Sequence, residues 1–241
     1  MLRSFFSGLR DILYPKICLA CKDKLKPKAA DELVCGKCWD NIKRNVPPFC
    51  SRCGRHLAKN NITKSVCPAC VRKVLHFDRA YSPAVYAGPL KELIHEFKYK
   101  NKDYLGGTLS KLISEFIKEY KIPLELIDYI MPVPLHQARL RQREFNQAQV
   151  LSRHIAEEFD KTMLENVLIR HKNTRTQTEL EPQLRLSNVL GSFSVKNAAA
   201  INRRNILLID DVLTTGATCS EAALALKNAG AGIVFALTLA N

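Results

Sequence analysis

The chain has 241 residues, of which 46% are hydrophobic and 25% charged, and its formal net charge is +14. This composition is ordinary for a soluble globular protein. No apolar run approaches the roughly 18 residues that a membrane span needs, which excludes an integral membrane protein.

The positive charge is concentrated in the N-terminal third. Up to His76 there are 16 Lys/Arg against 5 Asp/Glu, whereas the remainder has 21 against 18. A basic region of this kind is typical of contact with nucleic acid or another polyanion, although solvated lysines are frequent in any soluble protein.

Residues 1–16 predict an amphipathic helix, with Leu2, Phe5, Leu9 and Ile12 on one face. The segment lacks a continuous apolar stretch and a small-residue cleavage site, so we do not interpret it as a signal peptide. Docking onto the rest of the protein is favoured over a membrane-surface or targeting role. Without a secretory signal, we expect a reducing, cytoplasmic location.

Residues 17–76 contain four pairs of cysteines with the spacing Cys-x2-Cys. The pairs are Cys18/Cys21, Cys35/Cys38, Cys50/Cys53 and Cys67/Cys70. A shift of 32 residues superimposes the first two pairs on the last two, which predicts two tandem zinc ribbons. Each ribbon would hold one structural Zn²⁺ with four thiolates. The repeat favours sequential pairing of the knuckles and leaves interleaved pairing open; disulfides and an iron–sulfur cluster are the alternatives.

One aromatic and two imidazole side chains lie near the cysteines. Trp39 follows Cys38 and is expected to cover a zinc knuckle, with stacking on a nucleic-acid base as the alternative. His56 and His76 are not expected to replace a cysteine, because both cysteine sets are complete.

From Phe77 onward, strand-like and helix-like segments alternate. Strands are expected at 80–86, 127–133, 167–168, 192–195, 206–209 and 233–239; helices are expected at 90–99, at 105–120, over a long segment carrying Phe145 to Phe159, and from Ser220 to a stop at Gly230. This alternation predicts a mostly parallel sheet with helices on both faces and a ligand at the carboxyl ends of the strands.

The segment 205–218 carries the chain's most informative motif. Two acids, Asp210 and Asp211, stand where the apolar strand is expected to end, and Thr214-Thr215-Gly216-Ala217-Thr218 leads into a helix. A strand, a turn of small residues and a helix N-terminus suit a phosphate, because N–H groups and the helix dipole point at it. Carboxylates beside such a loop accept hydrogen bonds from sugar hydroxyls, which indicates a ribose phosphate.

This segment closely resembles the signature of the type I phosphoribosyltransferases. The resemblance implies that Asp210 and Asp211 are the catalytic pair, holding the ribose 2- and 3-hydroxyls of phosphoribosyl pyrophosphate. It also implies that residues 214–218 hold the 5-phosphate and that Mg²⁺ arrives with the substrate. Cys219 is expected to pack the first helical turn and not to act as a nucleophile.

The whole chain is similar to the ComF family, which has a double zinc ribbon and a phosphoribosyltransferase-like domain and includes ComFC-like and GntX-like proteins. The resemblance is carried by the four cysteine pairs, by Tyr86 to Tyr99 (YAGPLKELIHEFKY), by Met131-Pro-Val-Pro-Leu-His136, by Arg143-Glu-Phe-Asn-Gln147, and by Arg170, Thr174, Gln177, Arg185 and Asn188. It implies an α/β, type I phosphoribosyltransferase fold with an N-terminal double zinc ribbon. The expected division is 1–16, 17–76 and 77–241.

The pyrophosphate end of such a site needs cations or N–H groups. Lys98, Pro134 in the turn after the second strand, and Arg143 are the cofactor-binding candidates, with Arg139 and Arg185 as further cations. The family usually has glycine where this chain has Glu144. If that glycine allows the backbone to approach the pyrophosphate closely, Glu144 disturbs the contact. If the position lies in a helix, Glu144 favours the helix.

Two functions from different classes follow from the resemblance. In the first, the chain is an accessory protein of DNA uptake that handles single-stranded DNA, binds phosphoribosyl pyrophosphate or a nucleotide, and works with other competence or DNA-processing proteins. In the second, it is a phosphoribosyltransferase with an unidentified small-molecule acceptor. No acceptor-recognition segment can be named, which favours the first.

Overall fold

The structure is a computed structural model that describes residues 16–25, 32–58, 65–173 and 188–241. The amphipathic helix expected at 1–16 therefore lies outside the described residues, apart from residue 16. The candidates Thr174, Gln177 and Arg185 lie outside them as well.

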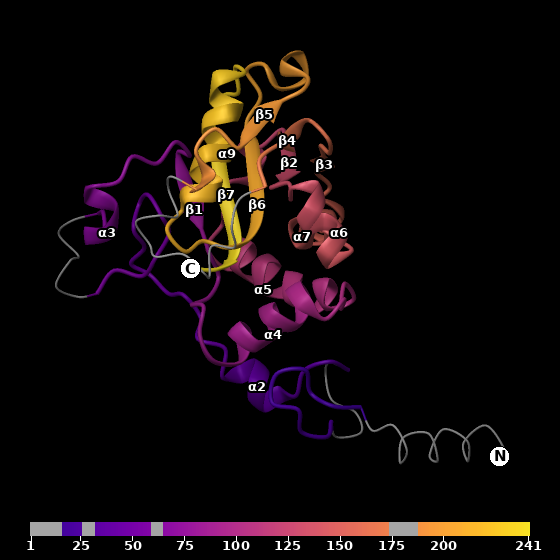
Figure 1. The fold of residues 1–241 in the computed structure, drawn as a ribbon. Helices are drawn as coiled ribbons and strands as arrows, with labels where there is room; N and C mark the ends of the chain where they lie inside the picture. The colour runs from indigo at the N-terminus through magenta and orange to yellow at the C-terminus, as the bar shows by residue number, and fades with distance from the viewer. Residues whose placement is uncertain (1–15, 26–31, 59–64, 174–187) are drawn as a thin grey trace.

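A five-stranded sheet forms the centre of the molecule (Figure 1). Its strands lie in the order β1-β7-β6-β2-β3, and all neighbouring pairs are parallel. They are β1 (Arg79–Tyr81), β2 (Tyr129–Pro132), β3 (Thr162–Met163), β6 (Ile206–Val212) and β7 (Val234–Ala240). A separate antiparallel pair joins β4 (Leu168–Arg170) to β5 (Phe193–Val195).

Helices cover both faces of the sheet. The elements between the strands are α4 (Gly88–Tyr99), α5 (Leu105–Glu119), η2 (Leu124–Leu126), α6 (Gln137–Arg143), α7 (Gln147–Glu158), η4 (Ala198–Ile201) and α9 (Ala217–Asn228). Along β6, Leu207 and Ile209 belong to the core under α4, α5 and α7, whereas Ile206 and Leu208 belong to the core under α9. The alternation follows from the two-residue period of a strand, so β6 separates two cores.

Helix α4 shows why the local sequence folds as it does. Gly88 and Pro89 begin the helix, and proline is tolerated there because its missing N–H would have no helical partner. Leu90, Ile94 and Phe97 then follow at helical spacing and are fully buried. Each such side chain contributes about 1.5–3 kcal/mol on burial, which fixes α4 against the sheet.

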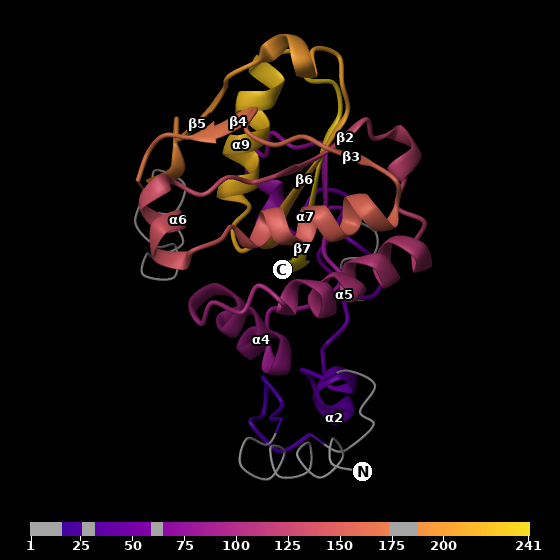
Figure 2. The same ribbon diagram turned by 90° about the vertical axis from the view of Figure 1, so that its right-hand side faces the viewer.

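The two cysteine-rich halves pack on different parts of this framework. The first half contains α2 (Gly36–Asp40), and its Cys18, Leu19 and Ile42 join the core under α4 and α5. The second half contains α3 (Pro68–Val71), and its cysteines join the core under α9. In Figures 1 and 2, α2 lies beneath α4, and Figure 1 shows α3 to one side of the sheet.

The architecture confirms the expected fold class, a parallel sheet flanked by helices and preceded by a double zinc ribbon. One expected element is wrong in its extent: the strand expected at 80–86 ends at Tyr81, and only a single bridge pairs Ala84 with Ala240. Pro83 follows Tyr81 closely, and proline cannot donate to a strand ladder.

The long helix expected to carry Phe145 to Phe159 is also different. Phe145 lies between α6 and α7, and the Asn146 side chain caps α7 by accepting a hydrogen bond from the Ala148 amide at 3.1 Å. Phe159 is the residue after the last turn of α7. There are three smaller differences. The sequence did not predict β3, and α9 begins at Ala217 instead of Ser220. Strand β6 continues through both acids to Val212.

Candidate functional site

The acid pair lies near the carboxyl end of β6, with one carboxylate toward each core. Asp210 lies beside α9, where the Cys219 thiol donates to its Oδ2 over 3.7 Å. Asp211 lies beside α4, where the Lys98 ammonium forms an ion pair with its Oδ2 at 2.8 Å. The strand's two-residue alternation therefore connects neighbouring acids to elements on opposite faces of the sheet.

Asp210 is in an environment that opposes its ionisation. Burial and the negative charge of Asp211 raise the pKa of Asp210 to about 7, although the Asp211 amide, Lys98 and Arg170 act in the opposite direction. The Asp211 amide donates to Asp210 Oδ1 at 2.8 Å. A carboxyl that titrates near neutral pH is unusual outside functional sites.

Arg170, at the end of β4, was named in the sequence analysis only as a residue that carries the family resemblance, without a role at the site. Its side chain is buried, its guanidinium lies 5.4 Å from the centre of the Phe193 ring, and burial lowers its pKa to about 10. The charges of Arg139 and Arg143 act in the same direction and that of Asp210 opposes them.

The loop after the acids turns directly into α9. Gly216 caps the helix with φ of 81°, a left-handed conformation that favours glycine. The Ala217 amide donates to Thr215 Oγ1 at 3.3 Å, and the Leu213 amide donates to the Ala240 carbonyl at 2.8 Å. The loop is thus anchored at both ends, and the N-terminus of a twelve-residue helix opens beside Asp210.

The turn from β2 to α6 runs beside the same strand end. The Val133 amide donates to the Ile209 carbonyl at 2.9 Å, so Val133 lies level with Asp210 and Pro134 follows it. His136 caps α6, its Nδ1 accepting from the Ala138 amide at 3.2 Å. This turn therefore positions its backbone at the carboxyl edge of the sheet.

Arg143 ends α6 and is held by aromatic and amide contacts. Its guanidinium lies 5.2 Å from the centre of the Tyr99 ring and donates to Gln147 Oε1 at 3.1 Å. Of the three predicted cofactor-binding residues outside the 210–218 motif, only Lys98 directly contacts an acid of the pair. Arg143 acts on the site through its charge.

Glu144 does not lie in a helix. It follows α6 with φ of 66° and ψ of −24°, and its side chain accepts a hydrogen bond from the side-chain amide of Asn101. Few residues other than glycine and asparagine adopt this left-handed conformation readily. The idea that Glu144 improves a helix is therefore wrong; glycine suits this position because of its backbone.

The eight paired cysteines form two clusters, joined in the sequential pairing that the repeat favoured. Within each cluster, the four sulfurs lie within 4.8 Å of one another. The Cys21 and Cys35 sulfurs are 3.8 Å apart, and those of Cys53 and Cys67 are 3.7 Å apart. A tetrahedron with Zn–S bonds of about 2.3 Å has sulfurs about 3.8 Å apart, so both clusters fit Zn²⁺.

Backbone amides complete the zinc knuckles. The Cys35 amide donates to Cys18 Sγ and the Cys67 amide donates to Cys50 Sγ, each at 3.3 Å. These equivalent bonds hold one sulfur of each ribbon in position. Zn²⁺ bound here would have four protein ligands and no open position, which is the arrangement of a structural metal.

Trp39 packs against the core that contains Cys18 and Cys38, as expected for a residue that covers a knuckle. The Arg44 guanidinium lies 5.4 Å from the centre of its ring. His56 contacts the Val46 carbonyl through Nδ1 at 2.8 Å and belongs to neither cysteine cluster.

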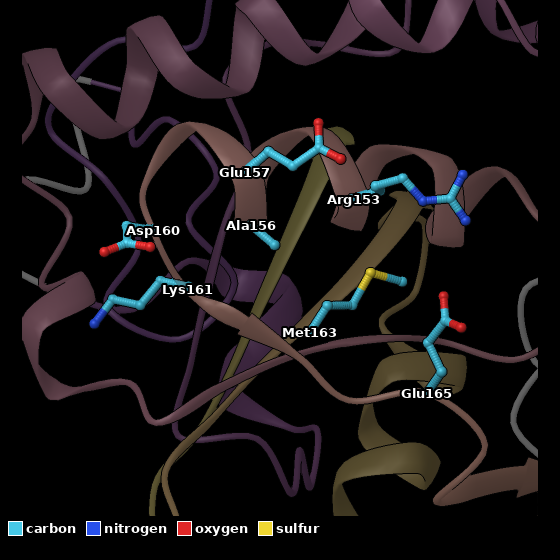
Figure 3. Close-up of a pocket in the computed structure, with 7 residues that line it drawn as sticks. All are labelled: Arg153, Ala156, Glu157, Asp160, Lys161, Met163 and Glu165. Atoms are coloured by element: carbon cyan, nitrogen blue, oxygen red, sulfur yellow. The ribbon is translucent and has the colours of Figure 1, made fainter.

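A hollow of about 560 Å³ lies elsewhere, between the end of α7 and β3 (Figure 3). It is lined mainly by charged side chains around Met163. β3 pairs with the beginning of β2, which in turn pairs with the beginning of β6. The hollow is therefore at the opposite end of the strands from Asp210 and contains none of the predicted site residues.

Within the described ranges, none of the helices combines the length and the apolar character required to cross a bilayer.

Comparison with known proteins agrees with this arrangement. Residues 9–71 match the model of the double zinc ribbon domain. The chain is 32% identical to "Competence protein F" of Haemophilus influenzae over 218 residues, covering 88% of this chain and 91% of that protein. It is 29% identical to "DNA utilization protein YhgH" of Escherichia coli, covering 91% and 94%, and 30% identical to "Competence protein ComFC" of Bacillus subtilis, covering 90% and 91%.

Among solved structures, the glutamine phosphoribosylpyrophosphate amidotransferase of Bacillus subtilis resembles 57% of this chain at 19% identity and a TM-score of 0.35, over only 26% of its own chain. The adenine phosphoribosyltransferase of Leishmania donovani resembles 54% at 20% identity and a TM-score of 0.33, over 51% of its chain. The sequence similarity to the three competence and DNA-utilisation proteins, which extends over about nine-tenths of this chain, is the decisive finding. The chain belongs to the ComF family of competence and DNA-utilisation proteins.

Proposed function

We propose that this protein is an accessory factor of DNA uptake that binds a 5-phosphoribosyl ligand at the β6–α9 junction and handles single-stranded DNA through its basic zinc ribbons. The observation that carries the first part is the arrangement of Asp210 and Asp211 beside a loop that opens a long helix. The names of the relatives support the DNA-uptake setting.

The ligand we propose is phosphoribosyl pyrophosphate or a close relative. The two carboxylates would accept hydrogen bonds from the ribose hydroxyls, while the amides of residues 214–218 would surround the 5-phosphate. Lys98 and Arg143 would balance the charge of a pyrophosphate. Mg²⁺ would bind with the ligand's oxygens and neutralise them, since Mg²⁺ prefers one or two carboxylates together with phosphate.

Lys98 gives this site a built-in competitor for the ligand. Its ammonium is 2.8 Å from Asp211, and both side chains are largely shielded from solvent. A ribose hydroxyl or Mg²⁺ that approaches Asp211 would have to share or displace this contact. Lys98 would then be free to move to the pyrophosphate.

Calorimetric titration of magnesium phosphoribosyl pyrophosphate into the zinc-loaded protein tests the ligand. We expect saturable binding in the parent and at least a hundredfold loss in Asp210→Asn/Asp211→Asn, because two charge-assisted hydrogen-bonding groups are removed. Glu157→Gln/Asp160→Asn is the matched control, since it removes two exposed acids from the distant hollow. No binding by the parent, or equal loss in the control, would contradict the proposal.

The ribbons supply exposed cations for a DNA backbone. Lys24, Lys37, Lys43, Arg55 and Arg72 are all exposed. Arg52 is not available in the same way, because its guanidinium donates to backbone carbonyls of its own ribbon. The exposed cations lie on the two small ribbon subdomains, where a single strand of DNA could contact them. The affinity would come from contacts with its phosphates.

Single-strand binding is tested by fluorescence anisotropy at several salt concentrations. Neutralising Lys37, Lys43 and Arg55 with glutamine should weaken binding and reduce the slope of log affinity against log salt by about 2, at about 0.7 per lost phosphate contact. Lys121→Gln/Arg153→Gln removes two exposed cations outside the ribbons and should change little. An unchanged slope in the ribbon variant would remove the ribbons as the DNA-binding part.

The second candidate function is phosphoribosyl transfer to a small acceptor. The cations around the acid pair favour it, because Arg170 is buried near Asp210 while Lys98 and Arg143 lie on the adjacent helices. Such groups would stabilise the negative charge that develops on a departing pyrophosphate. Release of pyrophosphate that depends on an added acceptor, and that Lys98→Met abolishes, would establish turnover.

A further inference from the structure

The second zinc ribbon contacts the phosphate-binding loop directly. The Lys73 ammonium donates to the Thr215 carbonyl at 3.3 Å, and the His76 amide donates to Ser220 Oγ at 3.0 Å. A Cβ added at Gly216 would lie 3.3 Å from Leu75 and 3.6 Å from Phe77. The linker that follows Cys70 therefore covers one side of the loop.

That linker is in turn held by the ribbon. The Arg52 guanidinium donates to the carbonyls of Cys70 at 3.2 Å, Lys73 at 2.8 Å and Leu75 at 3.4 Å. Because Arg52 lies between Cys50 and Cys53, the first knuckle of the ribbon and the linker form one unit. Order in the linker should therefore depend on the metal that closes this ribbon.

The metal site and the loop are separated by very little space. Cys53 and Cys70 line a cavity whose other wall is formed by residues 213–216, and its volume is about 20 Å³. This is enough for a single water molecule and too small for a ligand. The contact between the second ribbon and the loop is therefore packing, not a second binding pocket.

The described part of the first ribbon packs on a different surface. It meets α4 and α5 through ion pairs of Lys22 with Glu96 at 2.7 Å and of Arg44 with Glu115 at 3.1 Å. These helices cover the other face of the sheet from α9. The two zinc sites thus support different parts of the molecule.

Lys73 acts on the orientation of one peptide group. In a trans peptide, the C=O and the following N–H point in opposite directions. When Lys73 holds the Thr215 carbonyl toward the ribbon, the Gly216 N–H points away from the ribbon. A backbone N–H fixed in this way is a preorganised donor for a phosphate.

We propose that the second zinc ribbon braces the phosphate loop, that is, holds residues 213–219 in one conformation. Lys73 is the positioning residue, and zinc at Cys50/Cys53/Cys67/Cys70 thereby controls the affinity of the loop for a ribose 5-phosphate group. The part that concerns affinity rests on the proposed ligand site. The part that concerns the order of the loop does not, and it can be measured without any ligand.

The test compares full-length, zinc-loaded variants by hydrogen exchange of the segment 213–219 and by titration with ribose 5-phosphate. Lys73→Met should speed exchange in this segment and weaken the affinity, each about tenfold, the size expected on losing a charged hydrogen bond. Lys73→Arg should restore both. Lys121→Met removes an exposed cation outside the ribbons and should leave both unchanged.

A second comparison separates the two metals. Cys53→Ser/Cys70→Ser should lose one zinc and show fast exchange at 213–219, with protection of the buried helix α7 retained. The equivalent first-ribbon variant, Cys21→Ser/Cys38→Ser, should lose one zinc with slow exchange at 213–219 preserved. Residues 151–155 of α7 serve as the reference for global unfolding, which would affect every segment.

Each outcome decides one of the two proposals. Unchanged exchange at 213–219 in Lys73→Met and in the second-ribbon variant would overturn the brace, as would equal effects from both ribbon variants. If the parent binds neither ribose 5-phosphate nor magnesium phosphoribosyl pyrophosphate, the proposed ligand site fails. The exchange data then still decide whether the ribbon braces the loop.

Discussion

Asp210 should reduce the stability of the folded protein at neutral pH, and its replacement by asparagine should recover that stability. The folded pKa of Asp210 is about 7, against an ordinary value of 3.8. Stability therefore falls as pH rises from about 4 to 7, because the unfolded chain releases its proton first and the folded protein is then forced to ionise a partly buried carboxyl group. Above pH 7 the penalty is constant.

The size of the effect follows from the pKa difference. One pKa unit corresponds to about 1.4 kcal/mol, so the upper limit is about 4 kcal/mol; since Asp210 is only partly shielded from solvent, we expect about 2 kcal/mol at pH 8.5. Asp210→Asn cannot ionise and still offers an oxygen to the Asp211 amide. Its Tm should exceed that of the parent by roughly 4–8 °C at pH 8.5.

Calorimetric or circular-dichroism melting at pH 5.5, 7 and 8.5 measures this. The gap between variant and parent should shrink to about half at pH 5.5, because most of Asp210 is then protonated. Asp160→Asn removes an exposed carboxylate far from the site and should change Tm by less than about 1 °C. A lower Tm for Asp210→Asn at pH 8.5, or a gap independent of pH, would refute the reasoning. Greater stability combined with lost ligand binding would mark Asp210 as a residue kept for function.

Three further predictions concern the backbone and the metals. Gly54→Ala should destabilise the protein by about 2 kcal/mol or more in chemical denaturation, because φ is +69° and the new Cβ would lie 2.4 Å from the Ala80 carbonyl oxygen. The control is Gly36→Ala, whose Cβ would meet nothing within 4 Å and which should change the stability by less than about 1 kcal/mol. E144G should be more stable than E144A by about 1 kcal/mol, since both lose the Asn101 contact and only glycine relieves the left-handed backbone; equal stabilities would show that the backbone adapts. Metal analysis of the purified protein should give two zinc ions per chain, and a strong chelator should remove them with loss of structure in the ribbons; structure retained in zinc-free protein would contradict a structural role.

The sequence was most informative where structure is local. Helix α4 begins and ends within two residues of its predicted bounds, because Leu90, Leu93, Ile94 and Phe97 give a clear helical period and Gly88-Pro89 starts it. The break between α6 and α7 was missed because it depends on Glu144 in a left-handed conformation, which the identity of a glutamate does not suggest.

The candidate site was predictable in its contiguous part and less so where distant segments meet. Asp210 to Thr218 lie together because they are consecutive, and the strand–loop–helix geometry follows from their types. The pairing of Lys98 with Asp211 joins residues more than a hundred positions apart, and Lys98 was named from the family resemblance alone. Arg170 and Lys73 owe their positions near Asp210 and Thr215 to packing of the β4–β5 pair and of the second ribbon, which no local pattern encodes.

The two ribbons repeat with a spacing of 32 residues, yet equivalent positions meet different demands. Lys22 and Gly54 are related by that spacing and have nearly the same backbone, with φ of 67° and 69°. The Lys22 side chain extends to Glu96 on α4 at 2.7 Å, whereas any side chain at Gly54 would collide with the Ala80 backbone. Lys22→Gly should therefore cost little more than one half-exposed ion pair, while Gly54→Lys should prevent the second ribbon from seating on β1. Repetition thus explains the zinc chemistry of the ribbons, and the surface on which each ribbon packs explains why, among the described residues, the second ribbon and not the first contacts the loop that precedes α9.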